Sequence, residues 1–165
     1  MEKIEVSLTK LDSELLARAI DLAQLARTRG DHPFGAVILF PSGRSLEAMN
    51  SVVTDNDVTA HAELNAIRQA QREAPNELLA GATLYASTEP CVMCSGAAFM
   101  AKLGRVVYAL SQLDLALMQP QPPCYQLDGS FPTIYQVLAS TRLSVVDGPF
   151  NNAAAREVHR DFWSI

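Results

Sequence analysis

The sequence of 165 residues contains only three cysteines, Cys91, Cys94 and Cys124, and no apolar run approaches the roughly 18 residues that a membrane span requires. Three cysteines cannot form a closed framework of disulfides, which argues against a small secreted scaffold. The opening segment, MEKIEVSLTKLDSELL, lacks the long apolar core of a signal peptide. We therefore expect a cytoplasmic protein that does not associate with a membrane.

Basic residues are also scarce, since 13 Lys and Arg face 18 Asp and Glu and the net charge is −5. An acidic chain is a poor match for a partner that is bound through its phosphates, so we do not expect a nucleic-acid partner. The sequence shows no internal repeat and no low-complexity tract, and 48% of its residues are hydrophobic. This length and composition predict one domain over residues 1–165.

Hydrophobic periodicity and helix or turn signals divide the chain into alternating helices and strands. The first helix can be capped by Asp12 or Ser13 and ended by Gly30. A proline-rich segment at 119–124 predicts a loop. This alternation predicts a layered α/β domain with helices on the sheet faces. The expected helices span 11–30, 60–73, 91–102, 133–140 and 151–163, and the expected strands span 34–40, 45–53, 82–88, 105–110 and 142–148.

Cys91 and Cys94 lie three positions apart at the start of an expected helix, directly after Pro90. Two small buried residues, a redox dithiol and half of a metal site are the three interpretations. Residues i and i+3 share a helix face, so both sulfur atoms can reach one point. The positive end of the helix dipole favours thiolate over thiol, which supports the redox and the metal interpretations alike.

His61 and Glu63 favour the metal interpretation, because they lie in the first turn of the preceding expected helix. Helices that follow consecutive strand elements bring their N-terminal ends together at one edge of the sheet. His61, Cys91 and Cys94 then offer one nitrogen and two sulfurs, a ligand set that suits one Zn²⁺ per chain. Three protein ligands leave the fourth tetrahedral position open, which is typical of catalytic zinc, and Glu63 is the expected general acid and base.

Four segments together resemble the cytidine deaminase-like superfamily, and more narrowly its purine branch of guanine deaminases and tRNA adenosine deaminases. They are HPFGAV (32–37), HAELNAI (61–67), TLYASTEPCVMCSGAA (83–98) and GRVVYA (104–109). The resemblance implies a three-layer αβα sandwich with a five-stranded mixed sheet, usually as a homodimer. It also implies hydrolytic deamination, in which a zinc-activated water attacks an aminated ring carbon and Glu63 delivers protons to the ring nitrogen and the leaving amine.

The resemblance further suggests residues that bind the substrate. Asn50 would hydrogen-bond the base, Asp114 would accept from the amino and imino edge of guanine, Phe34 would pack on the ring, and Ala62 also belongs to this set. Simpler alternatives are a turn role for Asn50, a helix cap for Asp114 and a core role for Phe34. His32 receives no catalytic role.

Asp114 makes guanine the favoured substrate of a reaction that yields xanthine and ammonia, although cytosine, a triazine or a modified purine stays open. The C-terminal Phe162 and Trp163 either close the site or pack the last helix on the core, and packing is slightly favoured. A tRNA adenosine deaminase is the alternative enzyme, but the tail is only mildly basic. An alternative of another class is a noncatalytic, zinc-stabilised binding protein, against which Glu63 argues.

Overall fold

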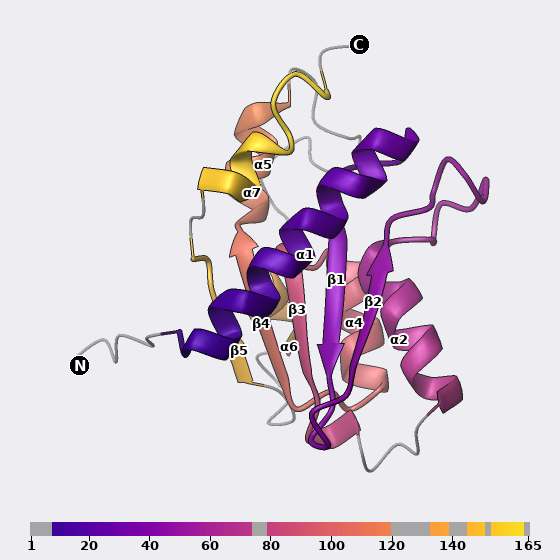
Figure 1. The fold of residues 1–165 in the computed structure, drawn as a ribbon, viewed down its shortest axis with the longest axis vertical. Coiled ribbons are helices and arrows are strands. Elements are labelled where there is room, and N and C mark those ends of the chain that lie inside the picture. The colour runs from indigo at the N-terminus through magenta and orange to yellow at the C-terminus, as the bar shows by residue number, and fades with distance from the viewer. Residues whose placement is uncertain (1–7, 74–78, 120–132, 139–144, 151–152, 164–165) are drawn as a thin grey trace.

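The chain folds around a five-stranded sheet, seen in a computed structural model that describes residues 8–73, 79–119, 133–138, 145–150 and 153–163 (Figure 1). The strands are β1 (Gly35–Leu39), β2 (Ser45–Met49), β3 (Thr83–Thr88), β4 (Arg105–Leu110) and β5 (Val145–Asp147). The helices are α1 (Lys10–Arg29), α2 (Ala62–Glu73), α4 (Val92–Met100), α5 (Gln112–Met118), α6 (Ile134–Leu138) and α7 (Ala153–Glu157).

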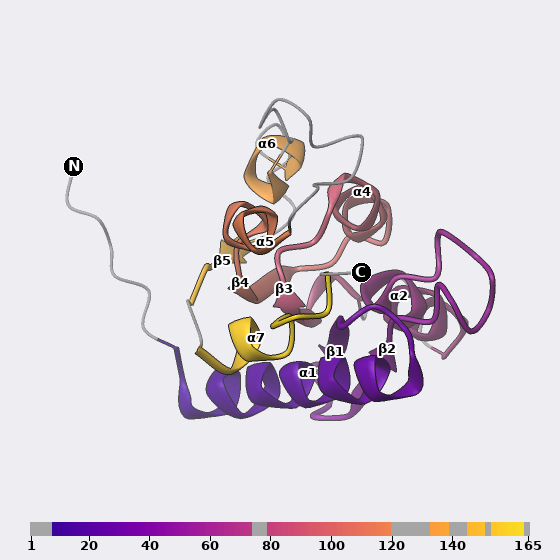
Figure 2. The ribbon, with the colours of Figure 1, turned by 90° about the horizontal axis from the view of Figure 1, so that it is seen from above.

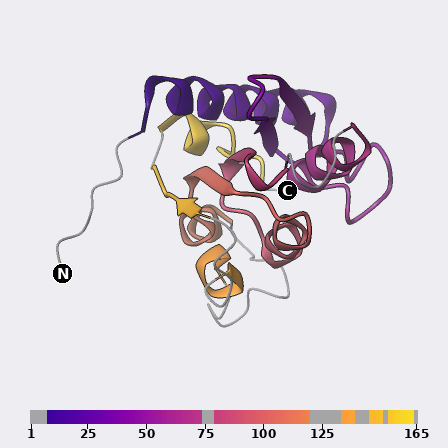
Figure 3. The same ribbon diagram turned by 90° about the horizontal axis from the view of Figure 1, so that it is seen from below.

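The sheet is mixed, with the strand order β2-β1-β3-β4-β5. Strand β1 pairs antiparallel with both of its neighbours, whereas β3, β4 and β5 run parallel to one another. Helices α1 and α7 lie on one face and α4 and α6 on the other, as the two end views show (Figures 2 and 3). The predicted three-layer arrangement around a five-stranded mixed sheet is therefore confirmed.

Two apolar clusters, one on each face of the sheet, join the helices to the strands. Val37 packs in the cluster beneath α1, and its neighbour Ile38 packs in the cluster beneath α2 and α4. This alternation follows from the two-residue period of a strand, and it explains why β1 is apolar at consecutive positions. Because the central strands are buried on both faces, their ends have fixed positions. The candidate site lies at one of these ends.

The start of α1 differs from the prediction. Thr9 is the N-cap: its Oγ1 accepts from the Asp12 backbone N–H at 3.0 Å, and the Asp12 carboxylate accepts from the Thr9 backbone N–H at 3.0 Å. The expected cap at Asp12 or Ser13 is wrong, because Asp12 instead occupies the third helical position of a capping box. Gly30 ends the helix in the left-handed conformation, with φ of 96°, as predicted.

The C-terminal third also departs from expectation. Helix α5 was expected only in the helix-cap alternative for Asp114, and it begins where the Ser111 hydroxyl accepts from the backbone N–H of Asp114. The last helix, expected over 151–163, is described only as α7, and residues 158–163 form turns. The proline-rich segment after Gln119 lies outside the described residues. In the described part of the chain, no helix is long and apolar enough to cross a membrane.

Candidate active site

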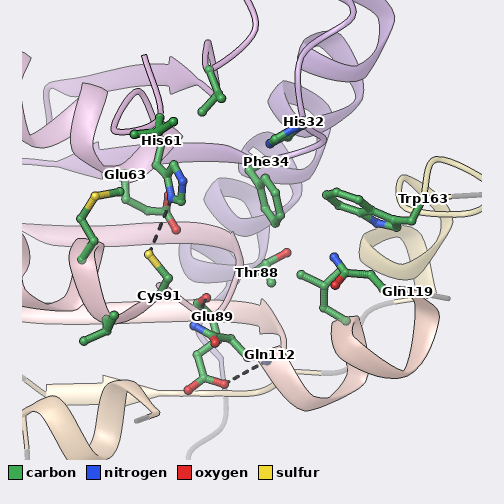
Figure 4. Close-up of a pocket in the computed structure, with 15 residues that line it drawn as sticks. His32, Phe34, His61, Glu63, Thr88, Glu89, Cys91, Gln112, Gln119 and Trp163 are labelled. Atoms are coloured by element: carbon green, nitrogen blue, oxygen red, sulfur yellow. Dashed lines mark hydrogen bonds between the residues drawn. The ribbon is translucent and has the colours of Figure 1, made fainter. Parts of the chain in front are cut away.

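His61, Cys91 and Cys94 meet where α2 and α4 begin. His61 directly precedes α2, Cys91 is the N-cap residue of α4, and Cys94 lies in the first turn of α4. The His61 Nδ1 atom is 3.6 Å from each of the two Sγ atoms, and all three ligand atoms lie within 4.8 Å of one another. The sequence predicted this cluster, and the structure brings its three members together. Figure 4 shows two of them, His61 and Cys91.

The spacing of these atoms suits zinc. Zinc binds nitrogen at about 2.0–2.1 Å and sulfur at about 2.3 Å, so tetrahedral angles place the two ligand atoms about 3.6 Å apart. The distances from His61 Nδ1 to the two sulfur atoms have this value. One imidazole and two thiols also form a ligand set that favours zinc, because magnesium and calcium prefer oxygen ligands. The three residues therefore fit a zinc ion with one coordination position left for another group.

Cys91 and Cys94 can both be thiolates only if a cation is bound between them. A hydrogen bond from Cys94, opposed by burial and aided by His61, lowers the pKa of the Cys91 thiol to about 4. The same contact with Cys91, together with burial, raises the pKa of the Cys94 thiol. One thiolate thus suppresses the other in the protein alone, and a bound dication would remove that conflict.

Glu63 lies beside this cluster as the second residue of α2, with only 6% of its surface exposed. Its Oε2 atom accepts a hydrogen bond from the Cys94 thiol at 3.7 Å. Burial, and after it the charge of Cys91, raise the pKa of the Glu63 carboxyl to about 7. A carboxyl of this kind can both take up and release a proton near neutral pH.

A cavity of about 430 Å³ opens onto the cluster. Figure 4 shows His61, Glu63 and Cys91 at one end, Trp163 and Gln119 at the other, and Phe34 and Thr88 between them. The volume is within the usual range of small-molecule sites, and apolar side chains make up much of the wall. The lining residues are His32, Phe34, Val52, Val58, His61, Glu63, Thr88, Glu89, Cys91, Val92, Met93, Gln112, Leu115, Gln119 and Trp163.

Of the residues expected to bind substrate, some line the cavity and others are buried outside its wall. Phe34 lines the cavity. Asn50 is fully buried; its Oδ1 accepts from the Val52 backbone N–H at 3.1 Å, and its Nδ2 has no partner in the described part of the chain. Ala62 is fully buried in the core at the start of α2.

Asp114 is not brought to the cavity. Its carboxylate accepts from the Ser111 hydroxyl at 2.7 Å and from the Arg156 guanidinium. It thereby joins the first turn of α5 to α7, and it is not among the residues that line the cavity. Asp114 therefore lies at the start of a helix, as the helix-cap alternative expects, but the N-cap is Ser111 and Asp114 occupies the third helical position, as Asp12 does in α1.

Several lining residues were missed. Glu89 is part of the quoted segment TEPC and could have been noticed there; it is buried, and its carboxylate accepts from the backbone N–H groups of Gln112 and Ile134, both at 3.1 Å. Gln119 follows α5 and had no recognisable signal. His32, given no role, also lines the cavity.

Trp163 satisfies both alternatives for the tail. Its indole lines the cavity of its own chain, and it also packs against Phe34 and His159, with ring centroids 6.2 and 6.0 Å away. His159 is 1% exposed, and its Nε2 is 3.3 Å from the hydroxyl of Thr88, another lining residue. The tail therefore forms part of the cavity wall without a second subunit.

Comparison with known proteins agrees with this geometry. The profile of the cytidine and deoxycytidylate deaminase zinc-binding region matches residues 9–110. The probable cytosine deaminase of Schizosaccharomyces pombe is 35% identical over 162 residues, which cover 94% of each chain. The tRNA-specific adenosine deaminase of Buchnera aphidicola is 38% identical over 104 residues, 63% of this chain and 69% of the relative.

The guanine deaminase of Bacillus subtilis is 43% identical over 102 residues, which cover 61% of this chain and 65% of the relative. Its crystal structure superposes with a TM-score of 0.60 over 67% of this chain and 69% of that one, at 40% identity. The matched residues 9–110 include every ligand of the proposed zinc site and Glu63.

Proposed function

Because the chain belongs to the cytidine and deoxycytidylate deaminase zinc-binding family and is a deaminase, we propose that it hydrolyses the amino group of a free nucleobase or a related small heterocycle. The observation that carries the proposal is the cavity, which has the metal ligands at one end and Trp163 of the same chain at the other. A cavity that the tail bounds in this way suits a small planar ring better than a nucleotide within a folded RNA.

The chemistry divides between the metal and Glu63. Zinc held by His61, Cys91 and Cys94 would supply Lewis-acid activation of a water molecule. Glu63 moves the protons: its carboxylate accepts one from the attacking water and passes it to the ring nitrogen, and it then accepts the second proton of that water and passes it to the leaving amine. Burial raises the pKa of Glu63, which helps its carboxyl to hold a proton between the two transfers, and the same burial keeps competing water away.

The ring is held by the walls of the cavity. Phe34 and Trp163 offer aromatic surfaces against which a flat base can pack. Asn50 is fully buried and is not among the residues that line the cavity; its unpartnered Nδ2 is the observation that supports a role in binding the base. Ala62 is the first residue of α2 and directly follows His61, so its backbone lies beside the end of the cavity where the reaction takes place.

Two bases are the first candidates. Guanine is supported by the Bacillus subtilis relative, but the argument from Asp114 no longer favours it. Cytosine is supported by the Schizosaccharomyces pombe relative, whose similarity extends over 94% of this chain. A tRNA substrate is the alternative that the Buchnera aphidicola relative suggests, and the net charge of −5 argues against it.

The test is ammonia release by zinc-loaded protein from cytosine, guanine, adenine, the matching nucleosides and tRNA, with Glu63→Gln as the control. Release from one free base and from no nucleoside is the expected result. Inosine formation in tRNA without reaction of any free base would overturn the proposal. Homodimer formation stays a prediction, which sedimentation of the same preparation would check.

A further inference from the structure

Two unpaired polar atoms lie at the end of the cavity that is remote from the metal ligands. Oε1 of Gln119 and Nε1 of Trp163 are buried, and neither has a hydrogen-bond partner in the described part of the chain. Both residues line the cavity, and Figure 4 shows them across it from His61 and Cys91. Buried polar groups are nearly always paired, so an unpaired acceptor and donor in one cavity wall indicate that a ligand supplies the missing partners.

The surroundings leave these two atoms for the ligand. Glu89 also lines the cavity, but its two oxygens already accept from the backbone N–H groups of Gln112 and Ile134. Phe34 and Leu115, which also line the cavity, carry no polar side-chain atoms. His32 lines the cavity beside Trp163, with ring centroids 5.7 Å apart, so the remote end holds the unpaired acceptor of Gln119 and the unpaired donor of Trp163 together with one imidazole.

A free nucleobase carries the complementary pair on the side away from the reacting amine. In cytosine, N1–H lies directly across the ring from the amino-bearing carbon and is adjacent to the C2 carbonyl. In guanine, N9–H and the acceptor N7 lie on the imidazole ring, away from C2, the carbon that carries the reacting amine. In both bases this N–H is the position that carries the sugar in a nucleoside.

We propose that Gln119 Oε1 accepts a hydrogen bond from this ring N–H and that Trp163 Nε1 donates to the acceptor beside it. The pair thus selects the free base and rejects its N-glycosylated or N-alkylated form. Substitution at that nitrogen removes the donor and leaves Gln119 Oε1 buried without a partner. A site that is built to hydrogen-bond its substrate discriminates strongly against an analogue without the bonding group. This inference rests on the proposed function, since it names the substrate class of the same site.

The kinetic test compares each free base with its methyl derivative, cytosine with 1-methylcytosine and guanine with 9-methylguanine. Gln119→Leu keeps the approximate size of the side chain and removes the acceptor, and Trp163→Phe keeps an aromatic ring and removes the donor. Gln119→Leu is expected to lower kcat/KM for the free base by about tenfold to hundredfold and to leave the value for the methyl base unaffected. Trp163→Phe is expected to lower both values, because the methyl base keeps the acceptor to which Trp163 donates. Gln71→Leu, at an exposed glutamine of α2, is the matched control and should change neither value. Equal loss for both substrates in Gln119→Leu, or no loss for the free base in either variant, would overturn the inference.

A binding measurement separates this inference from the proposed reaction. Trp163 is the only tryptophan of the chain, so its fluorescence reports directly on the remote end of the cavity. In the Glu63→Gln background, cytosine or guanine should change the emission at concentrations at least about tenfold lower than the methyl base, and Gln119→Leu should abolish this difference. Selective binding without ammonia release from the wild type would leave the recognition pair intact and refute the deaminase substrate proposed above. Ammonia release, with a ratio of free-base to methyl-base affinity that Gln119→Leu leaves unchanged, would support the proposed reaction and refute the recognition pair. The absence of both binding and ammonia release would refute both proposals.

Discussion

The Nδ1 atom of His61 lies 3.6 Å from the Sγ atom of Cys94, although 33 positions separate the two residues. The contact exists because α2 and α4 both begin at the same end of the sheet, where β3 delivers Cys91 and the loop after β2 delivers His61. Neither helix alone holds three ligands. The metal site is therefore a property of the sheet topology as much as of the ligand residues.

Removal of one thiol should remove the metal. Cys91→Ser is expected to bind less than about one tenth of the zinc that the wild type binds, which should be about one per chain, because a hydroxyl is a much poorer zinc ligand than a thiolate. The variant should also lose about 4 kcal/mol of stability at free zinc a thousandfold above the wild-type Kd. Metal analysis and thermal unfolding check both effects.

Cys124→Ser is the control, because the third cysteine is not among the three ligands. In that background, chelation of zinc should raise the number of thiols that react with a colorimetric reagent from about zero to about two. Stoichiometric zinc would also exclude a redox dithiol. Full zinc in Cys91→Ser would contradict the assigned ligand set.

Glu63→Gln should separate chemistry from structure. The amide keeps the size of the side chain but cannot move protons, so kcat should fall by about 10²–10⁴ or more while zinc content stays unchanged. Turnover and metal analysis on the same preparation measure this. Glu73→Gln, at the exposed end of the same helix, should retain wild-type turnover. A Glu63→Gln enzyme that works normally would rule out the assigned proton carrier.

The catalytic end of the site could be predicted from the sequence because its residues occupy fixed places in local structure. His61 and Cys91 stand immediately before α2 and α4, and the apolar runs that form β1, β3 and β4 are long enough to place those helices. The alternation of helices and strands then limits the topology to a layered sheet. The positions of the ligands and the layered topology were therefore both predicted from patterns within short stretches of sequence.

The remote end depends on contacts that no local pattern encodes. Trp163 reaches the cavity because α7 ends at Glu157 and the following turns, with Asp161 at φ of 58°, redirect the tail. Asp114 turned toward Ser111 and Arg156 because α5 begins at Ser111. Helix α5 has only seven residues, about two turns, so its periodic signal is weak and its start could not be found from the sequence.

His159 should make stability depend on pH. Burial, and after it the charge of Arg27, lower the pKa of the His159 imidazole to about 4, and its other close neighbours, Phe34, Thr88 and Trp163, are uncharged. Between pH about 6.5 and about 4 the unfolded chain binds a proton that the folded chain does not, so the free energy of unfolding falls as pH falls. The loss should reach about 2 kcal/mol at pH 5.

His159→Phe removes this titration and keeps a buried ring. The measurement is urea unfolding of both proteins from pH 7.5 to pH 5. Both proteins lose zinc as the pH falls, so this effect cancels in the difference between their free energies of unfolding. The lost contact with Thr88 shifts the whole difference by a constant. Parallel stability curves across this range would show that His159 is not held neutral by the fold.

Asp31 should control the loop that carries Val52 and Val58 to the cavity. The side chain is fully buried; Oδ1 accepts from the backbone N–H groups of Val53 and Thr54, both at 2.9 Å, and Oδ2 accepts from Thr54 Oγ1 and from Arg29 Nε at 2.8 Å. Burial opposes ionisation, but the hydrogen bonds from Thr54 and Arg29 outweigh it and lower the pKa of the Asp31 carboxyl to about 2.

Asp31→Asn should therefore cost about 3 kcal/mol, because it leaves Arg29 without its anionic partner and turns one buried acceptor into a donor. Since the loop also forms part of the cavity wall, KM for the substrate should rise more than kcat falls. Asp21→Asn, at an exposed position of α1, should change stability by less than about 0.5 kcal/mol. Chemical unfolding and steady-state kinetics on the two variants measure these effects. A destabilised Asp31→Asn protein with an unchanged KM would mean that the loop does not shape the bound state, whereas unchanged stability would mean that the carboxylate does not hold the loop at all.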